Sequence, residues 1–358
     1  MATDHPREST ISTIEDVARL AGVSRGSVSN VLTGKVRMRD ATRERVLEAA
    51  RTLGYQPNRV ASALASGRYP SIALLTADIT NLVNADIVKA VEAVCTPRAY
   101  TVTICHTDKD VDRERAHLDD LLGHRVAGLI AKAEGAEPSR YARLLDAGTR
   151  IVLIDNPILD LDLPIVRLDR PTVTREALAC LAAAGHERIG VIVTDNPLPP
   201  GTIPTTGVLT DRFLAQGMVE QCAADLGLTI VVEARPLRSL ADGRDAMLAL
   251  LGRDQPPTAV FATTWLHTLG MLSVVNRMEA EERDRLGLIG AGVAEYLDAI
   301  APWLSYVEIP AREQGRVAIE LLFALLDGTA VPSRHEITLP LRLVERRSTA
   351  PRTSLRTA

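Results

Sequence analysis

The sequence of 358 residues has few aromatic side chains and no long apolar run. Phe, Trp and Tyr make up only 3% of it, so its cores must be built from Ala, Val, Leu and Ile, which favours an α/β architecture. No apolar run approaches the roughly 18 residues that cross a bilayer. The polar segment 1–10 has no apolar stretch like that of a secretory signal. We therefore expect a protein without a membrane anchor, located in the cytoplasm.

Motifs of the common enzyme classes are also missing. There is no G-x-S-x-G nucleophile elbow, no P-loop and no H-E-x-x-H zinc motif, and Gly290-Ala291-Gly292 is only half of a dinucleotide fingerprint. The four cysteines form no C-x-x-C pair, so we interpret them as small buried thiols. His117 and His124 could share a helix face, but no third metal ligand is near them. We expect no enzyme activity, no metal and no cofactor.

The formal net charge of −4 hides an uneven distribution. Residues 1–68 contain 11 Lys and Arg against 7 Asp and Glu, a formal charge of +4. Residues 69–358 contain 30 basic against 38 acidic side chains, a formal charge of −8. A basic head on an acidic body indicates that one part meets a polyanion and the other does not.

Residues 13–57 predict a head of three short helices. Thr13 is a candidate N-cap for the first helix, and Gly22 permits a sharp turn after it. Ser24 is then a second N-cap, for a helix over residues 25–32.

A third helix is predicted over residues 41–53, with Asp40 as its N-cap and Gly54 at its end. Two short helices joined by a tight glycine turn, with a third behind them, form a helix-turn-helix, which places the start of the second helix in the DNA major groove. We expect Arg25 to bind guanine with two hydrogen bonds and Asn30 to pair with adenine. A small helical core with merely solvated charges is the alternative.

Beyond Pro70, short β-rich runs alternate with helical stretches, which indicates parallel sheets built from βαβ units. Candidate strands are residues 72–76, 101–105, 126–131, 151–155, 189–194, 229–233, 259–263 and 286–290. Candidate helices are residues 85–95, 111–122, 139–147, 173–184, 211–226, 243–251, 266–278 and 312–326. The polar break at 159–164 is expected to divide this body into two similar doubly wound lobes, with a cleft for a small molecule between them.

Four segments of the head carry a family resemblance. Residues 13–24 (TIEDVARLAGVS), 27–32 (SVSNVL), 42–43 (TR) and 53–58 (LGYQPN) resemble the opening of the LacI/GalR family of bacterial transcription regulators. The resemblance covers essentially the whole chain and implies an all-α helix-turn-helix head, a hinge helix, and a two-lobed α/β effector domain like a periplasmic binding protein. The family often has Ser or Thr where Arg25 and Gly26 stand, so this pair is expected to set a distinct operator preference.

Residues 58–67 resemble the hinge helix of the family. This Ala-rich stretch is too short to be stably helical alone, but two copies could fold together on DNA. Leu64 would then be the apolar wedge that opens a base step in the minor groove. A plain linker is the alternative. The residues expected to contact DNA are Thr13, Ser24, Arg25, Gly26, Ser29, Asn30, Arg37, Thr42, Tyr55, Asn58, Ala61 and Leu64.

One recognition helix reads only a half-site, so we expect a homodimer on a pseudo-palindromic operator in double-stranded DNA, acting as a repressor at the nucleoid. The alternatives are an activator, a corepressor-dependent regulator and, in a different class, an enzyme or solute-binding module on the same α/β fold. The expected organisation is residues 1–12 as a disordered leader, 13–57 as the helix-turn-helix domain, 58–69 as hinge and linker, 70–347 as the effector and dimerisation domain, and 348–358 as a tail. The tail has no leucine heptads, so no tetramer is expected.

The resemblance also implies an effector site in the body. Arg212 falls where the family places an arginine that grips effector oxygens, and Asp155 ends a strand at the cleft. A surface ion pair is the alternative role for Arg212. The proline-rich segment 195–211 is expected to form either a lid or a disordered insertion.

Other pocket positions depart from the family pattern. Thr264, Trp265, Gly292, Val293 and Ile309 stand where the family usually has polar residues, and unpaired sugar hydroxyls are costly. We therefore expect a flatter, less hydroxylated effector, with Trp265 as a stacking wall and Arg212 or Asp155 fixing one polar end. The alternatives are a Trp265 that belongs to the core, and a body that senses no small molecule. The expected effector-binding residues are Asp155, Arg212, Thr264, Trp265 and Val293.

Overall fold

The computed structural model describes residues 12–33, 38–55, 69–135, 137–158, 160–194, 211–236, 238–329 and 335–350. The chain divides into two compact units, Met1–Tyr69 and Pro70–Ala358, which we call the head and the body. No described helix is long and apolar enough to cross a membrane.

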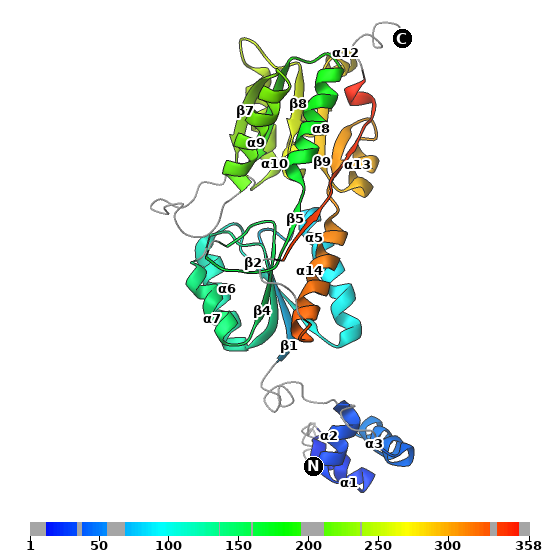
Figure 1. The fold of residues 1–358 in the computed structure, drawn as a ribbon. Coiled ribbons are helices and arrows are strands. Elements are labelled where there is room, and N and C mark those ends of the chain that lie inside the picture. Colours follow the sequence, from blue (N-terminus) through cyan, green and yellow to red (C-terminus); the bar gives the residue numbers. More distant parts are fainter. Residues whose placement is uncertain are drawn as a thin grey trace, which may run out of the picture. The chain divides into compact units, whose positions relative to one another are not determined.

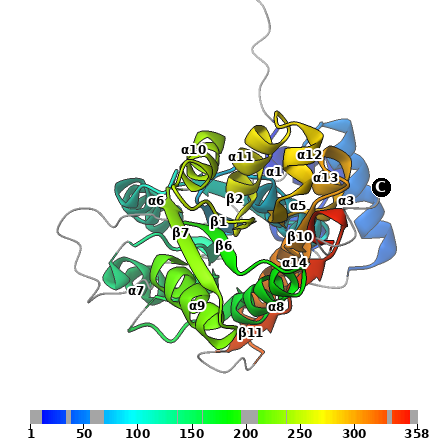
Figure 2. The ribbon, with the colours of Figure 1, turned by 90° about the horizontal axis from the view of Figure 1, so that it is seen from above.

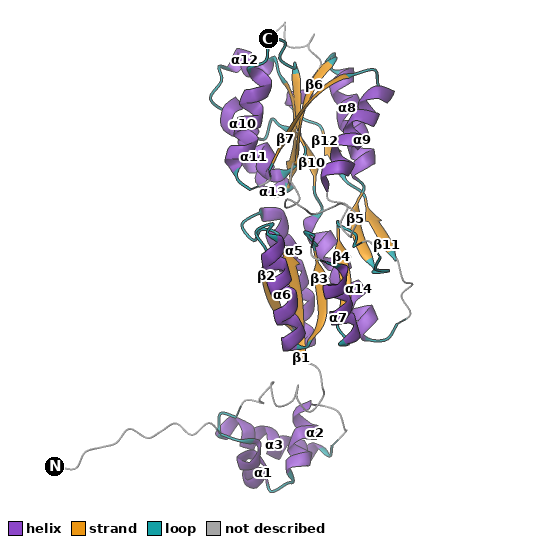
Figure 3. Cartoon of the chain, turned by 90° about the vertical axis from the view of Figure 1, so that its left-hand side faces the viewer, coloured by secondary structure: helices purple, strands orange, loops and turns teal. Residues whose placement is uncertain are grey.

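The described part of the head contains three helices around a small apolar core (Figure 3). They are α1 (Ile14–Ala21), α2 (Arg25–Thr33) and α3 (Asp40–Thr52). Each helix contacts the other two, because each turns a stripe of small or β-branched side chains inward. The buried side chains are Val17, Ala18, Ala21, Val28, Val46, Ala49 and Ala50.

Local hydrogen bonds fix the ends of the head helices. The Thr13 hydroxyl accepts from the Asp16 amide at 3.3 Å, and the Asp16 carboxylate accepts in return from the Thr13 amide at 3.0 Å. Gly22 takes the left-handed conformation (φ 64°) that ends α1, as expected. The expected Asp40 cap is wrong, because α3 already begins at Asp40 and Arg39 holds the N-cap position without a side-chain bond.

The N-terminal lobe of the body is a sheet covered by two helices on each face (Figure 1). Its strand order is β11-β5-β4-β3-β1-β2, and the pairs β1–β2, β3–β4, β4–β5 and β5–β11 are parallel. The strands are β1 (Tyr69–Thr76), β2 (Thr101–His106), β3 (Val126–Ala131), β4 (Arg150–Ile154), β5 (Ile165–Leu168) and β11 (Glu336–Leu339). Helices α5 (Leu82–Cys95) and α14 (Ala311–Leu326) cover one face, and α6 (Val111–His124) and α7 (Pro138–Asp146) cover the other.

The C-terminal lobe repeats this layout with the order β12-β10-β9-β8-β6-β7. Its strands are β6 (Arg188–Thr194), β7 (Thr229–Arg235), β8 (Ala259–Ala262), β9 (Gly287–Gly292), β10 (Ser305–Glu308) and the antiparallel edge strand β12 (Arg342–Val344). Figure 2 shows α8 (Arg170–Ala183) and α9 (Asp211–Asp225) on one side of the sheet, and α10 (Leu240–Leu251) and α11 (Trp265–Val275) on the other. The short helices α12 (Ala280–Asp284) and α13 (Ala294–Ile300) precede β9 and β10.

Within the described residues the chain crosses between the lobes three times. The crossings lie between β5 and α8, between β10 and α14, and between β11 and β12. The expected division at 159–164 is therefore wrong: β5 still pairs with β4, and α14 and β11 return to the N-terminal lobe (Figure 3). The spacing of apolar residues predicts a helix or a strand, but it does not predict which lobe that element joins.

One continuous cluster of buried apolar side chains joins the two lobes on the side of α8 and α14. It includes Leu168 and Val173 at the first crossing and Ile309 and Ala311 at the second. The lobes therefore share a core next to the crossings, and each has a second core on its opposite face.

The expected fold class is confirmed, since a helical helix-turn-helix region precedes a two-lobed α/β body with parallel sheets. The sequence pattern missed β5, β10, β11 and β12, which are only three or four residues long. The start of the expected polar tail is part of the C-terminal lobe, because the Ser348 hydroxyl donates to the Leu288 carbonyl at 2.6 Å and Thr349 Oγ1 lies 2.8 Å from Ser305 Oγ.

Helices α10 and α11 cross in direct backbone contact, which generates a stability prediction. A Cβ added at Gly270 would lie 2.5 Å from Gly243 Cα. We expect Gly270→Ala to lower the free energy of unfolding by about 1–3 kcal/mol or more, because the backbones must move apart. Urea unfolding of the full chain measures this. As control, the Cβ of Gly123→Ala in the last turn of α6 meets open space, so this variant should raise the free energy of unfolding by about 0.5–1 kcal/mol. Equal effects of the two variants would contradict direct backbone contact between α10 and α11.

Candidate functional site

The start of α2 carries exposed residues that are predicted to read DNA. Ser24, Arg25, Gly26 and Ser29 are exposed, whereas Val28 on the opposite side is fully buried in the head core. A Cβ at Gly26 would approach only the Ser24 hydroxyl, at 3.8 Å. The core of the head thus holds this turn while its outer side faces solvent, as a helix that enters a groove requires.

Arg25 forms an ion pair with Glu15 of α1, at 3.2 Å between Nη1 and Oε1. The two side chains are 73% and 54% exposed. An exposed pair of this kind contributes only about 0–1 kcal/mol, because water screens it. Arg25 can therefore exchange Glu15 for another acceptor at small cost.

The other residues expected to contact DNA have different surroundings. Thr13 belongs to the capping box of α1, and Thr42 and Asn30 are half-buried. Tyr55 is half-buried against the head core. The expected contacts Arg37, Asn58, Ala61 and Leu64 lie outside the described residues.

A cavity of about 270 Å³ lies in the body, at the carboxyl ends of the C-terminal lobe's strands and next to the crossings. This is where open α/β sheets bind ligands. The described residues that line it are Asp155, Arg167, Leu168, Arg170, Pro171, Val173, Thr174, Thr194, Met218, Val219, Phe261, Thr263, Thr264, Ala291, Val307, Ile309 and Leu341.

Asp155 is the buried charged centre of this site. It directly follows β4, and its side chain is only 6% exposed. Lys132 Nζ, just after β3, lies 3.0 Å from Oδ2, and the amide of Gln314 on α14 donates to Oδ1 at 2.8 Å. Arg170, the first residue of α8, lies 3.7 Å from Oδ2. The carboxylate thus ties together the ends of two strands and the starts of two helices.

The charge state of Asp155 follows from these neighbours. Burial raises the pKa of its carboxyl group, whereas the positive charges of Lys132 and Arg170 and the hydrogen bonds from Lys132 and Gln314 lower it. The net pKa lies below the ordinary value, so Asp155 is ionised at neutral pH.

The structure places Asp155 and Thr264 at the cavity, but Trp265 and Val293 are not among the described residues that line it. Trp265 is 4% exposed and belongs to the core beneath α11. A Cβ at Gly292 would collide with its ring, so the missing side chain makes room for the indole. The expectation of Trp265 as a stacking wall is therefore corrected in favour of the core alternative.

The side chain of Arg212 lies outside the described residues. Sequence reasoning missed two cavity arginines, Arg167 and Arg170. Arg167 could have been noticed, because it interrupts an otherwise apolar run, Ile165–Leu168, which forms β5.

Comparisons with known proteins agree with this architecture. The family described as bacterial regulatory proteins, lacI family, matches residues 13–58, and the periplasmic binding protein-like domain matches residues 178–349. The chain is 31% identical over 342 residues to the HTH-type transcriptional regulator PtxS of Pseudomonas aeruginosa, covering 95% of this chain and 96% of that protein.

Two further similarities span nearly the whole chain. It is 28% identical over 343 residues to Catabolite control protein A of Priestia megaterium, covering 94% of this chain and 99% of that protein. Among solved structures, the Lac repressor dimer bound to operator and the anti-inducer ONPF matches with a TM-score of 0.78 at 23% identity, covering 95% of this chain and 100% of that chain.

The Asp155 network predicts a pH-dependent stability. The pKa of Asp155 is lowered by folding, so the unfolded chain binds more protons in acid. The stabilisation is complete above the unfolded pKa of about 3.9 and is lost as the pH falls through the lower folded pKa. We expect Asp155→Asn to lower the free energy of unfolding by about 2 kcal/mol at neutral pH, and the difference from wild type to shrink below pH ~4. Denaturant unfolding from pH 7 to 3 measures it, and a constant difference would argue against an ionised Asp155.

Asp155→Ala provides the matched comparison. Asp155 has a left-handed backbone (φ 61°), which Asn tolerates and Ala does not. The alanine variant should lose about 1 kcal/mol more than the asparagine variant at every pH. Identical stabilities would show that the backbone conformation of Asp155 adds nothing.

Proposed function

Because the chain belongs to the LacI family of bacterial regulatory proteins and is a DNA-binding transcriptional regulator, we propose that it represses transcription as a homodimer on a pseudo-palindromic operator and that a small-molecule effector in the body controls it. It would act in the cytoplasm, where the chromosome is accessible. Its named relatives are regulators, which supports a role without catalysis.

The exposed first turn of α2 is the observation that carries the proposal. It lies inside the segment matched to the lacI family, and Arg25 presents its guanidinium to solvent there. In the groove, Arg25 would exchange Glu15 for O6 and N7 of a guanine, and Asn30 would pair with an adenine. Thr13, Ser24, Gly26, Ser29, Arg37, Thr42 and Tyr55 are proposed to support or position these contacts.

A homodimer follows from the geometry of such heads, because one α2 reads only half of a symmetric site. The Lac repressor in the matched structure is a dimer bound to operator, which supports the same arrangement here. We propose that Asn58, Ala61 and Leu64, whose placement the structure does not describe, form the hinge contacts, with Leu64 in the minor groove.

The cavity in the body is the proposed effector site. Its lining contains ten apolar residues, among them Phe261, Val307 and Leu341, beside four threonines and three charged side chains. The hydroxyls of a typical sugar that face these apolar side chains would lack partners, which supports an effector other than a sugar.

The three crossings suggest how an effector would act. The cavity contacts the first crossing at Leu168 and Arg170, the second at Ile309 and the third at Leu341. A ligand that binds one relative pose of the lobes more tightly than another shifts the equilibrium between them by that difference in affinity. We propose that this shift moves β1, which continues from the segment that joins the body to the head.

A substitution at Arg25 tests the DNA-reading role. With an operator located by genomic footprinting, Arg25→Ala should weaken binding by about 1–3 kcal/mol and relax the preference at one base pair of each half-site. Fluorescence anisotropy with the operator and with unrelated DNA of equal length measures both effects.

Arg51→Ala is the matched control for Arg25→Ala. Arg51 is 74% exposed on α3 and pairs with Glu48 at 2.9 Å, so the same charge is removed from the same unit. It should weaken binding to both DNAs alike, by less than Arg25→Ala does on the operator. An Arg25→Ala loss that is equal on operator and unrelated DNA would contradict base reading.

The nature of the effector gives a second test. Neutral pentoses and hexoses at millimolar concentration should leave the thermal unfolding midpoint of the full chain and its operator affinity unchanged, since most of the residues that line the cavity are apolar. A neutral sugar that raises the midpoint and alters operator affinity would show that the site is a sugar pocket.

A further inference from the structure

We propose that the effector is an organic anion, whose negative group lies against Arg167 and Arg170 while its apolar part fills the rest of the cavity. This inference rests on the proposed function of the cavity and adds the chemical class of its ligand. It concerns two arginines on β5 and α8.

The charge balance of the lining favours an anion. Its charged members are Asp155, Arg167 and Arg170. Asp155 already has Lys132 at 3.0 Å, the Gln314 amide at 2.8 Å and Arg170 at 3.7 Å, so its negative charge is compensated without Arg167. The lining therefore carries an excess of positive charge in a partly desolvated place, where opposite charge is attracted most strongly.

Arg167 has an unused hydrogen-bond donor. Its Nε is buried and has no partner among the described residues. Its other contact is a long one, 3.4 Å from Nη1 to Oε1 of Glu336 on the neighbouring strand β11. A buried N–H without an acceptor is costly and rare in folded proteins, and an anionic oxygen in the cavity would supply the acceptor.

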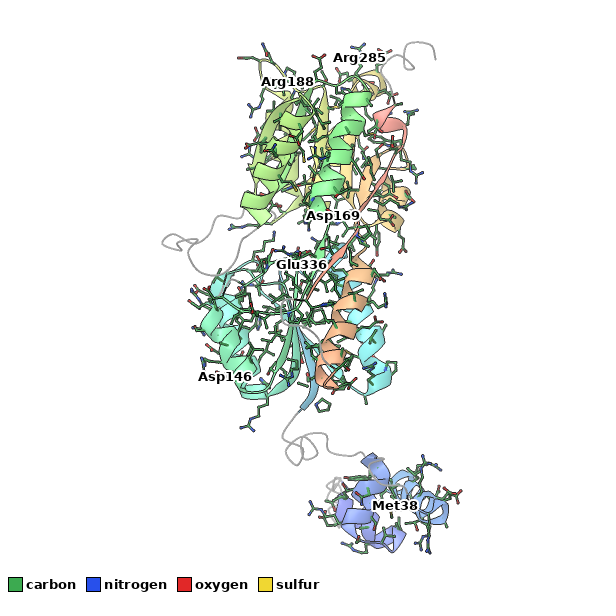
Figure 4. The ribbon with its side chains drawn as sticks, viewed as in Figure 1. Met38, Asp146, Asp169, Arg188, Arg285 and Glu336 are labelled. Carbon is green, nitrogen blue, oxygen red and sulfur yellow. The ribbon has the colours of Figure 1, made fainter. Side chains whose placement is uncertain are left out.

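The rest of the cavity is suited to an apolar body. Phe261, Val307, Ile309, Leu341 and Met218 line it. A ligand with one anionic group and a hydrocarbon or aromatic remainder would satisfy both parts of the lining, whereas an inorganic anion would leave the apolar part unfilled. Two residues labelled in Figure 4 mark this place, where the two lobes meet. Asp169 precedes Arg170 in the sequence, and Glu336 forms the ion pair with Arg167.

A pair of fluorescent probes tests the charge preference directly. 8-Anilinonaphthalene-1-sulfonate has the anionic group and the aromatic body, and N-phenyl-1-naphthylamine has the same ring system without the sulfonate. Titrated into the full-length chain, the sulfonate should bind about tenfold or more tightly than the neutral amine, which is the effect of one charge-assisted hydrogen bond.

Variants locate the binding. Arg167→Met should weaken sulfonate binding about tenfold or more and leave the neutral probe unchanged. Glu336→Gln should tighten it, because it removes a competing carboxylate from Arg167; a merely loosened structure would not have this effect. Arg170→Met should weaken it too. Arg285→Met is the charge-matched control, since Arg285 is 76% exposed at the opposite end of the C-terminal lobe (Figure 4).

Several outcomes would overturn the inference: equal binding of the two probes, failure of the sulfonate to bind, or sulfonate binding that Arg167→Met and Arg170→Met leave unchanged. If Arg167→Met does not fold by circular dichroism, Glu336→Gln decides, and weaker or unchanged binding counts against the inference. If the sulfonate does not bind and a neutral sugar alters operator affinity, the proposal of an anionic effector is wrong, whereas the proposed control by an effector stands. Arg167-dependent binding in a chain that binds no operator would instead remove the proposed function.

Discussion

The contacts of the buried Asp155 carboxylate hold the strand ends and helix starts of the body together at the cavity. It receives Lys132 from the end of β3 and Gln314 from α14, and Arg170 from the start of α8 lies near it. Two of the three crossings therefore converge on one charged group. The left-handed backbone of Asp155 directs the chain out of β4 at this point, so conformation and charge are fixed together. Of its partners, only Arg170 belongs to a helix of the C-terminal lobe, and Asp155 also lines the cavity.

The head is stabilised in a different way. Its core is made of Ala and Val side chains, which bury little area each, and its helix ends are fixed by the Thr13–Asp16 capping box and the Gly22 turn. The arginines that the structure describes in this unit are exposed, and their ion pairs are weak. We expect the basic charge of residues 1–68 to meet DNA phosphates and the acidic charge of the remaining chain to limit indiscriminate binding of DNA by the body.

Much of the fold could be predicted from the sequence because most of its elements have a local cause. Gly22 marks the turn after α1, and the apolar runs around Ile72 and Ile189 mark the strands β1 and β6, whatever the rest of the chain does. The return of α14 and β11 to the N-terminal lobe could not be predicted, since it depends on contacts between distant segments. The site shows the same limit. Asp155 could be found as a polar residue at a strand end, but the direction of Trp265 depends on the space left at Gly292, which lies at the end of the next strand along the chain.

In the proposed mechanism the head reads a symmetric DNA site while the body controls it. Selection of duplexes from a random library by the full-length chain tests this claim most directly, because the operator sequence need not be known in advance. We expect enrichment of two inverted half-sites that share a centre of symmetry, as two copies of α2 related by a two-fold axis require. Enrichment of a single unpaired half-site, or of no sequence at all, would contradict the mechanism.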